Sequence, residues 1–260
     1  MNKIRLIICI ASLIAFTGCA TLWPPPQEDV EARRLIDALQ HHNTQLKQYK
    51  ALANVSIDTK GKTHSGRVAM AAVMPDRMRL EWLSTVGQPL TRLAGDGKQI
   101  TIGVPGEIRI RRMPQTSTSL ERLIQIPIGI EELQSLTTGR PKLPEFTSAQ
   151  IVSRDAQRVV IALKDRWHRL QAKIDVEPTR GRLMRLENLD RDEEPLYAIC
   201  WKKWKMAGQY EIPKRVELTT PSGRRLVLSI ARFWPNVDVP PSLFKLTTPM
   251  IGSESSKGRD

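Results

Sequence analysis

The sequence predicts an α+β, mainly β fold: one curved antiparallel sheet, a half-barrel of about ten or eleven strands, covered by helices. From Tyr49 onward, apolar and polar residues alternate with a period of two over most of the chain. Turn signals such as 95–97 (GDG) and 221–223 (PSG) separate these segments, and serial hairpins build antiparallel sheets. A sheet this wide must curl or close, and helical patterns at 28–47 and 117–136 can cover one face.

The segment from Glu28 to about Lys47 is predicted to form an amphipathic surface helix. No Gly or Pro interrupts it, and Arg, Asp, Gln and His fill the positions between its apolar residues. The apolar residues that recur near a period of 3.6 are Val30, Leu35, Ile36, Leu39 and Leu46.

The first part of the sheet follows this helix as a meander. Lys60-Gly61-Lys62 is a turn, and Pro75-Asp76 ends the second strand. A short loop, STVGQP at 84–89, separates the third strand from the fourth. The predicted strands cover 51–58, 68–74, 77–82, the segment from Leu90, 100–102 and 108–110.

The segment 117–136 breaks the alternation and predicts short helices. Ser117 or Ser119 is expected to cap the first, which carries Leu120, Leu123 and Ile124. Pro127 ends it, and 129–136 is expected to form a further turn or two. Strands then resume, and they cover 159–163, 170–176, 183–189, 197–202, 216–218 and 226–230.

The N-terminus reads as a secretory signal spanning residues 1–18. Lys3 and Arg5 precede an apolar run, 6–16, that is too short to cross a membrane. The residues FTGC at 16–19 resemble a bacterial lipobox, in which the chain is cut before a cysteine that becomes lipidated. Cys19 is therefore the expected lipidation site, although an ordinary secretory signal with a bystander cysteine is the alternative.

The expected organisation after cleavage is a single domain on a tether. Residues 19–27 form the lipidated, Pro-rich tether, 28–249 the half-barrel, and 250–260 a polar tail expected to be disordered. Cys200 then has no partner cysteine, and we expect it to be a small buried side chain in a strand.

The net charge of +13 would indicate nucleic acid for a cytosolic protein, but an exported chain meets none. The charge indicates either contact with an anionic lipid surface or a solvated face. We also expect that the protein is not an enzyme and that it has no catalytic residue and no metal site. The only attached group expected is the covalent lipid on Cys19. The four histidines lack metal-ligand spacing, and neither a Gly-x-Ser-x-Gly elbow nor a dinucleotide loop is present.

Apolar side chains remain as the candidate functional groups. Several strands carry them on both faces, for example at 159–160, 183–184 and 226–227. This pattern indicates either a lipid-binding cavity or a plain core covered by helices. The candidates for lining a cavity are Leu80, Trp82, Leu170, Ile174, Ile199 and Trp201.

The layout from about Val30 to Pro249 resembles the LolB family of outer-membrane lipoprotein receptors, in the superfamily that includes LolA carriers. PDRMRLEWLSTVGQPLTRLAGDGKQITI at 75–102 resembles the family's strand, loop, strand and turn. SLERLIQIPIGIEELQSLTTGRP at 119–141 resembles its helical insertion, and IPKRVELTTPSGRRLVLSIARFW at 212–234 its last hairpin.

The resemblance implies a protein, most simply a monomer, anchored in the outer membrane and facing the periplasm. It would hold acyl chains in the half-barrel, accept lipoproteins from a LolA-like carrier and deliver them to the membrane. Val86 and Gly87 match the apolar tip of the family's membrane-inserting loop, with Val where Leu is usual. The alternative is an envelope sensor or assembly protein of the same fold that binds a protein partner.

Overall fold

The computed structural model describes residues 29–59, 61–104 and 110–246. The signal peptide predicted at 1–18, the tether at 19–27 with Cys19, and the tail at 250–260 lie outside these residues. Within them, thirteen strands form one sheet in the order β6-β5-β4-β3-β2-β1-β13-β12-β11-β10-β9-β8-β7. Every pairing between neighbours is antiparallel, so the predicted fold class is confirmed.

The strands divide into two runs around β1. The first run is β1 (Gln48–Thr59), β2 (Lys62–Val73), β3 (Arg77–Leu83), β4 (Pro89–Asp96), β5 (Gln99–Gly103) and β6 (Ile110–Pro114). The second run is β7 (Ser148–Arg154), β8 (Val159–Lys164), β9 (Leu170–Glu177), β10 (Arg182–Leu189), β11 (Pro195–Ala207), β12 (Tyr210–Thr219) and β13 (Arg225–Pro235). The helices are α2 (Val30–His41), α3 (Ser117–Ile124), α4 (Ile130–Thr138) and the 3₁₀ turn η1 (Pro241–Phe244).

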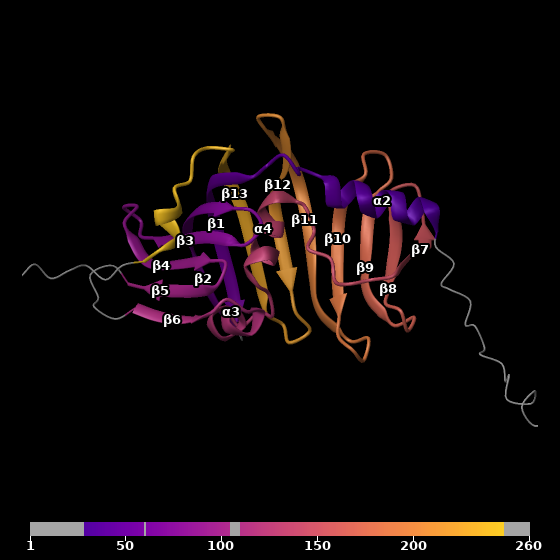
Figure 1. The fold of residues 1–260 in the computed structure, drawn as a ribbon, viewed down its shortest axis with the longest axis horizontal. Coiled ribbons are helices and arrows are strands. Elements are labelled where there is room, and N and C mark those ends of the chain that lie inside the picture. The colour runs from indigo at the N-terminus through magenta and orange to yellow at the C-terminus, as the bar shows by residue number, and fades with distance from the viewer. Residues whose placement is uncertain (1–28, 60, 105–109, 247–260) are drawn as a thin grey trace, which may run out of the picture.

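Pairing of β1 with β13 joins the two runs into one surface. Val55 lies opposite Leu228 in that pair, so residues from the start and the end of the chain are neighbours at the centre of the sheet. Figure 1 shows the curved sheet, with α2 across β7–β10, α4 over the middle of the sheet near β12, and α3 toward the half formed by β1–β6. The sheet has more strands than the ten or eleven expected. Ser148–Arg154, for instance, was not predicted as a strand, because most of its residues are polar.

The first helix is shorter than the sequence predicts. Asp29 caps it by accepting hydrogen bonds from the backbone N–H groups of Glu31 and Ala32. It ends at His41, and Asn43 then adopts a positive φ of 55°. The Asn43 side-chain amide donates to the carbonyl of Thr138 at 3.0 Å and to that of Glu211 at 2.8 Å. The region after α2 is thereby tied to α4 and β12 instead of continuing as helix.

The insertion forms two separate helices, α3 and α4. The N-cap of α3 is Thr116, whose hydroxyl accepts from the Ser119 N–H, so neither serine predicted as the cap fills that position. Glu132 reaches back to accept from the Gly129 N–H at 2.9 Å at the start of α4. Gly139 ends α4 with a φ of 71°, a conformation that glycine adopts without steric cost.

One face of the sheet carries the core. A row of residues crosses eight strands on this face, and each residue pairs with the next one on the neighbouring strand. Its members are Ile57, Leu226, Leu218, Ile199, Leu186, Ile174, Ile161 and Ile151. All belong to or pack against one hydrophobic cluster that also includes residues of α2, α3 and α4. The face that carries this row is therefore the one that the helices cover.

Candidate functional site

A cavity of about 370 Å³ lies between the first half of the sheet and the helices α3 and α4. The described residues that line it are apolar except for Thr91 and Thr137. The apolar lining residues are Val55, Ile57, Val68, Met70, Met78, Leu80, Trp82, Leu93, Ile102, Leu120, Leu133, Leu136, Leu226 and Leu228. The cavity is therefore a hydrophobic site without a charged group in its described lining.

The strands supply the floor of the cavity through their period of two. Met78, Leu80 and Trp82 of β3 all line it, because alternate residues of a strand point to the same face. Arg79 and Glu81 lie between them, and the Arg79 guanidinium donates to a Glu81 carboxylate oxygen at 2.6 and 2.9 Å. Arg79 and Glu81 are thus paired with each other and do not line the cavity.

Polar contacts hold α4 above the sheet. The indole N–H of Trp201 on β11 donates to the Ser135 carbonyl at 3.3 Å. The hydroxyls of Tyr49 and Thr137 hydrogen-bond to each other, and Thr137 Oγ1 lies 2.8 Å from the Gln134 carbonyl. Burial of Tyr49 raises the pKa of its phenol above the ordinary value. The contacts of Trp201 with Ser135 and of Tyr49 with Thr137 join α4 to the sheet beside the cavity.

Trp82 stands at the edge of the cavity. It also lines a shallower neighbouring groove, together with Ile57, Thr91, His64 and Gln125. The hydrophobic lining therefore continues through Trp82 toward a polar, solvent-exposed region. We take this side as the mouth of the cavity.

The β3–β4 loop presents Val86 to solvent. The Ser84 N–H donates to the Gln88 carbonyl at 2.8 Å, and the Gly87 N–H donates to the Ser84 carbonyl at 3.0 Å. Gly87 has a φ of 86°, which favours glycine. Val86 is 80% exposed. The loop is thus a hydrogen-bonded turn with a bare apolar tip, and insertion of this tip into lipid stays a prediction.

The six predicted lining residues fall into two groups. Leu80 and Trp82 line the cavity. Ile174, Ile199 and Trp201 are buried in the core of the second half of the sheet, and Leu170 is half-buried at the start of β9. These four are not among the described residues that line the cavity, because helix and loop side chains pack directly onto their half of the sheet. A role in binding acyl chains stays a prediction for all six.

Most of the residues that line the cavity were not among the candidates chosen from the sequence. Leu120, Leu133 and Leu136 come from the helices, and Val55 and Leu228 from the pair of strands that closes the sheet. The helical period of the insertion indicates an apolar face. However, nothing local in the sequence says which strands that face covers.

The described part of the chain offers few other candidate functional groups. Cys200 is half-buried on β11, where burial raises the pKa of its thiol. Among the residues that the structure describes, no group of three His, Cys, Asp or Glu residues is placed to hold a metal ion. The described helices include none with the length and apolar character required to span a membrane.

Comparisons with known proteins agree with this architecture. The family model described as "Outer membrane lipoprotein LolB" matches residues 47–233. A DUF1329 family protein from Desulfovibrio piger superposes with a TM-score of 0.62 at 10% identity, covering 83% of this chain and 96% of that one. A LolA superfamily protein from Nitrosomonas europaea gives 0.56 at 12% identity, with 83% and 97% covered. No curated protein sequence matches the chain.

Proposed function

The chain belongs to the LolB family of outer membrane lipoproteins, and from this premise we propose that it binds acyl chains in the cavity beneath α3 and α4. In this proposal the protein is anchored to the outer membrane through Cys19 and faces the periplasm. It accepts lipoproteins from a LolA-like periplasmic carrier and releases them into the membrane. The LolB family is a family of lipoprotein receptors without enzymatic activity.

The observation that carries the proposal is the open, apolar cavity. Its volume of about 370 Å³ lies within the range of about 300–1,000 Å³ typical of small-ligand sites. Each buried methylene of an acyl chain contributes about 0.8 kcal/mol. A chain of ordinary length therefore gains enough binding energy from hydrophobic contact alone, without a specific polar group.

The volume of the cavity and the residues of its floor also favour this function over that of a sensor that binds a protein partner. A half-barrel that serves only as a scaffold has no need for empty apolar volume, because unfilled space lowers stability. Met70 and Met78 line the floor, and methionine side chains adapt their shape to an irregular apolar occupant. Both features support a site that takes up and gives away flexible chains.

A cavity-filling substitution tests the proposal. Leu93 lines the cavity and is half-buried. The larger side chain of Leu93→Trp would therefore fill part of the volume in which we propose that acyl chains bind. Leu196→Trp is the matched control, since Leu196 on β11 is 40% exposed. Native mass spectrometry of protein extracted in mild detergent should show a bound triacylated lipopeptide in the wild type and in the control, and much less in Leu93→Trp. Equal retention in all three proteins, with equal melting temperatures, would rule out the cavity as the acyl site.

A further inference from the structure

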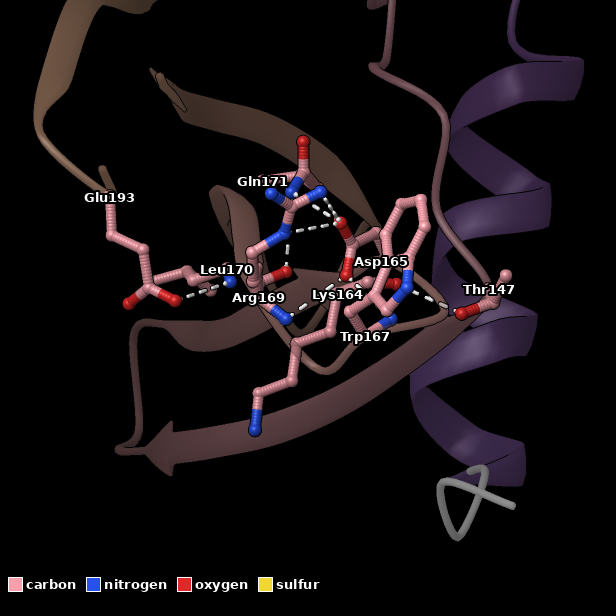
Figure 2. A network of polar contacts seen from close by, with 8 residues as sticks. All are labelled: Thr147, Lys164, Asp165, Trp167, Arg169, Leu170, Gln171 and Glu193. Carbon is pink, nitrogen blue, oxygen red and sulfur yellow. Dashed lines mark hydrogen bonds and ion pairs between the residues drawn. The ribbon is translucent and has the colours of Figure 1, made fainter. Parts of the chain in front are cut away.

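A second apolar feature, far from the cavity mouth, lies on the turn between β8 and β9. Trp167 is 58% exposed there, compared with 42% for Trp234, the other exposed tryptophan among the described residues. A groove formed by Phe146, Thr147 and neighbouring residues lies beside it. Figure 2 shows the indole standing at the edge of a dense polar network. An exposed indole on an ordered support requires an explanation, because Trp is usually largely buried.

Asp165 organises the turn that presents Trp167. One of its carboxylate oxygens accepts from the backbone N–H groups of Trp167 at 2.8 Å and Arg169 at 3.0 Å. The other accepts two bonds from the Arg169 guanidinium, at 2.9 and 2.7 Å (Figure 2). Partial burial would raise the pKa of Asp165, but these hydrogen bonds outweigh it and lower the pKa. Asp165 is therefore ionised near neutral pH and can accept all four of these hydrogen bonds.

Two guanidinium groups flank the indole. The Arg166 guanidinium carbon lies 3.8 Å from the ring centroid of Trp167, and that of Arg169 lies 4.8 Å away. Asp165 balances the charge of Arg169. No described carboxylate forms an ion pair with Arg166. The turn thus presents an amphipathic aromatic ring together with a cation that can meet an external anion.

The start of the described chain lies beside this turn. The Asp29 N–H donates to the Ala149 carbonyl on β7 at 3.3 Å, and the Asp29 carboxylate accepts from the Ile151 N–H. Ala149 pairs with Leu163 of β8, two residues before Asp165. A tether anchored at Cys19 would therefore join the domain at the same end of the sheet as Trp167.

The length of this tether limits how far that end can stand from lipid. Cys19 and Asp29 are ten positions apart, a distance of at most about 36 Å when fully extended. The thirteen strands span about 60 Å along the sheet at the usual spacing. The tether is too short to reach across the sheet, so an anchor at Cys19 keeps the β7–β9 end within about 36 Å of the membrane.

We propose that the β8–β9 turn contacts the outer-membrane lipid surface, with the Trp167 indole at headgroup level and the Arg166 guanidinium on a lipid phosphate. Tryptophan is enriched at membrane interfaces because one part of its ring is apolar and its N–H is polar. Arginine near an anionic surface adds electrostatic attraction. The proposal depends on the Cys19 anchor of the proposed function, and it places the β8–β9 turn of the anchored domain at the membrane surface. Trp and Arg also form contacts in protein interfaces, but the tether argument favours the bilayer.

Fluorescence quenching tests this orientation. The lipidated full chain is prepared with Trp23→Phe, because Trp23 lies only four positions from the anchor at Cys19 and lipid would quench it in any orientation. This parent protein is reconstituted in vesicles of phosphatidylethanolamine and phosphatidylglycerol, with or without bromine on the acyl chains near the headgroups. Bromine should quench this parent protein, and adding Trp167→Phe should remove most of the quenching. Trp234→Phe is the matched control, because Trp234 is 42% exposed on β13 and should contribute little. Arg166→Gln should weaken the quenching when phosphatidylglycerol is present.

Two results would overturn the proposal. The first is quenching that Trp167→Phe leaves unchanged in the Trp23→Phe parent while the protein remains on the vesicles. The second is a Trp167 that lipid never quenches but that an added soluble acyl-chain carrier protein shields, which would assign the turn to a protein contact. Lipopeptide retention by the same samples tests the cavity separately. A vesicle-bound protein that retains lipopeptide but shows no Trp167 quenching refutes only this contact.

Discussion

The indole of Trp82 lies against the backbone of Gly66, so that a Cβ atom at position 66 would sit 2.5 Å from both Nε1 and Cε2 of the ring. Real Cβ atoms do not approach other atoms this closely. The two residues belong to neighbouring strands, since Val68 of β2 pairs with Trp82 of β3. Glycine at position 66 therefore leaves the room that the Trp82 ring occupies beside β2, at the mouth of the cavity.

Gly66→Ala should displace the Trp82 ring and disturb the cavity mouth. We expect a loss of about 1 to 3 kcal/mol in stability from the forced repacking, together with altered lipopeptide retention and a changed near-UV circular dichroism signal. Gly103→Ala is the control, because a Cβ there meets only Ile110 Cγ1 at an ordinary 3.6 Å. The double variant Gly66→Ala with Trp82→Leu should recover stability. An unchanged spectrum and melting temperature in Gly66→Ala would contradict this account of Trp82.

Val86→Glu should leave folding and membrane anchoring unchanged while impairing delivery of cargo to the membrane. Val86 is 80% exposed, so its side chain contributes little to the core. Insertion of one valine into lipid contributes about 1 to 2 kcal/mol at about 25 cal/mol per Å², enough to bias transfer but too little to anchor a protein. Val86→Leu should preserve or improve delivery. A liposome-transfer assay and a thermal melt on the same samples measure both effects, and normal transfer with a normal melt would dismiss the role of this loop.

Tyr49→Phe should alter both the stability and its dependence on alkaline pH. Removing the hydroxyl breaks its hydrogen bond to Thr137 and should cost about 1 kcal/mol near pH 7. Burial raises the pKa of the Tyr49 phenol in the folded state. Since the unfolded chain loses the phenolic proton above pH about 10, the stability contributed by this tyrosine is complete below that pH and declines as the pH rises further.

Chemical unfolding of the wild type and of Tyr49→Phe between pH 8 and 11 tests whether stability falls with rising pH as expected. The variant should lose less stability per pH unit above pH about 10. Burial likewise raises the pKa of Tyr197, so some alkaline sensitivity should remain in Tyr49→Phe. Parallel stability curves for the two proteins would show that Tyr49 titrates normally in the folded state.

Cys19→Ser should release the protein from the outer membrane or leave an uncleaved precursor. The reason is that the proposed thioether-linked lipid requires the cysteine sulfur, and stable anchoring requires more than one acyl chain. Ala20→Asp should redirect the protein to the inner membrane if the organism sorts lipoproteins by the residue after the cysteine. Fractionation of membranes with immunoblotting gives the location and the size of each variant. A Cys19→Ser protein of normal mature size that remains in the outer membrane would disprove lipidation at this position.

The sequence alone determined the fold class because the information for strands and turns is local. Alternation such as that of Met78, Leu80 and Trp82 requires only the backbone geometry of a strand, and Gly and Pro mark the turns between such segments. The helical break near 117–136 was equally visible, since α3 and α4 both lie within or near it. Resemblance in the order of these elements was sufficient to identify the family.

Only the tertiary structure decided which apolar residues face open space and which fill a core. Trp82 and Ile199 occupy the same face of the sheet, yet the first lines the cavity and the second is buried. The difference depends on where α2, α3 and α4 lie over the sheet, which is set by contacts between distant residues such as Trp201 with Ser135 and Asn43 with Glu211. A period of two places a side chain on one face of a strand, but the packing of helices across many strands determines what that face meets.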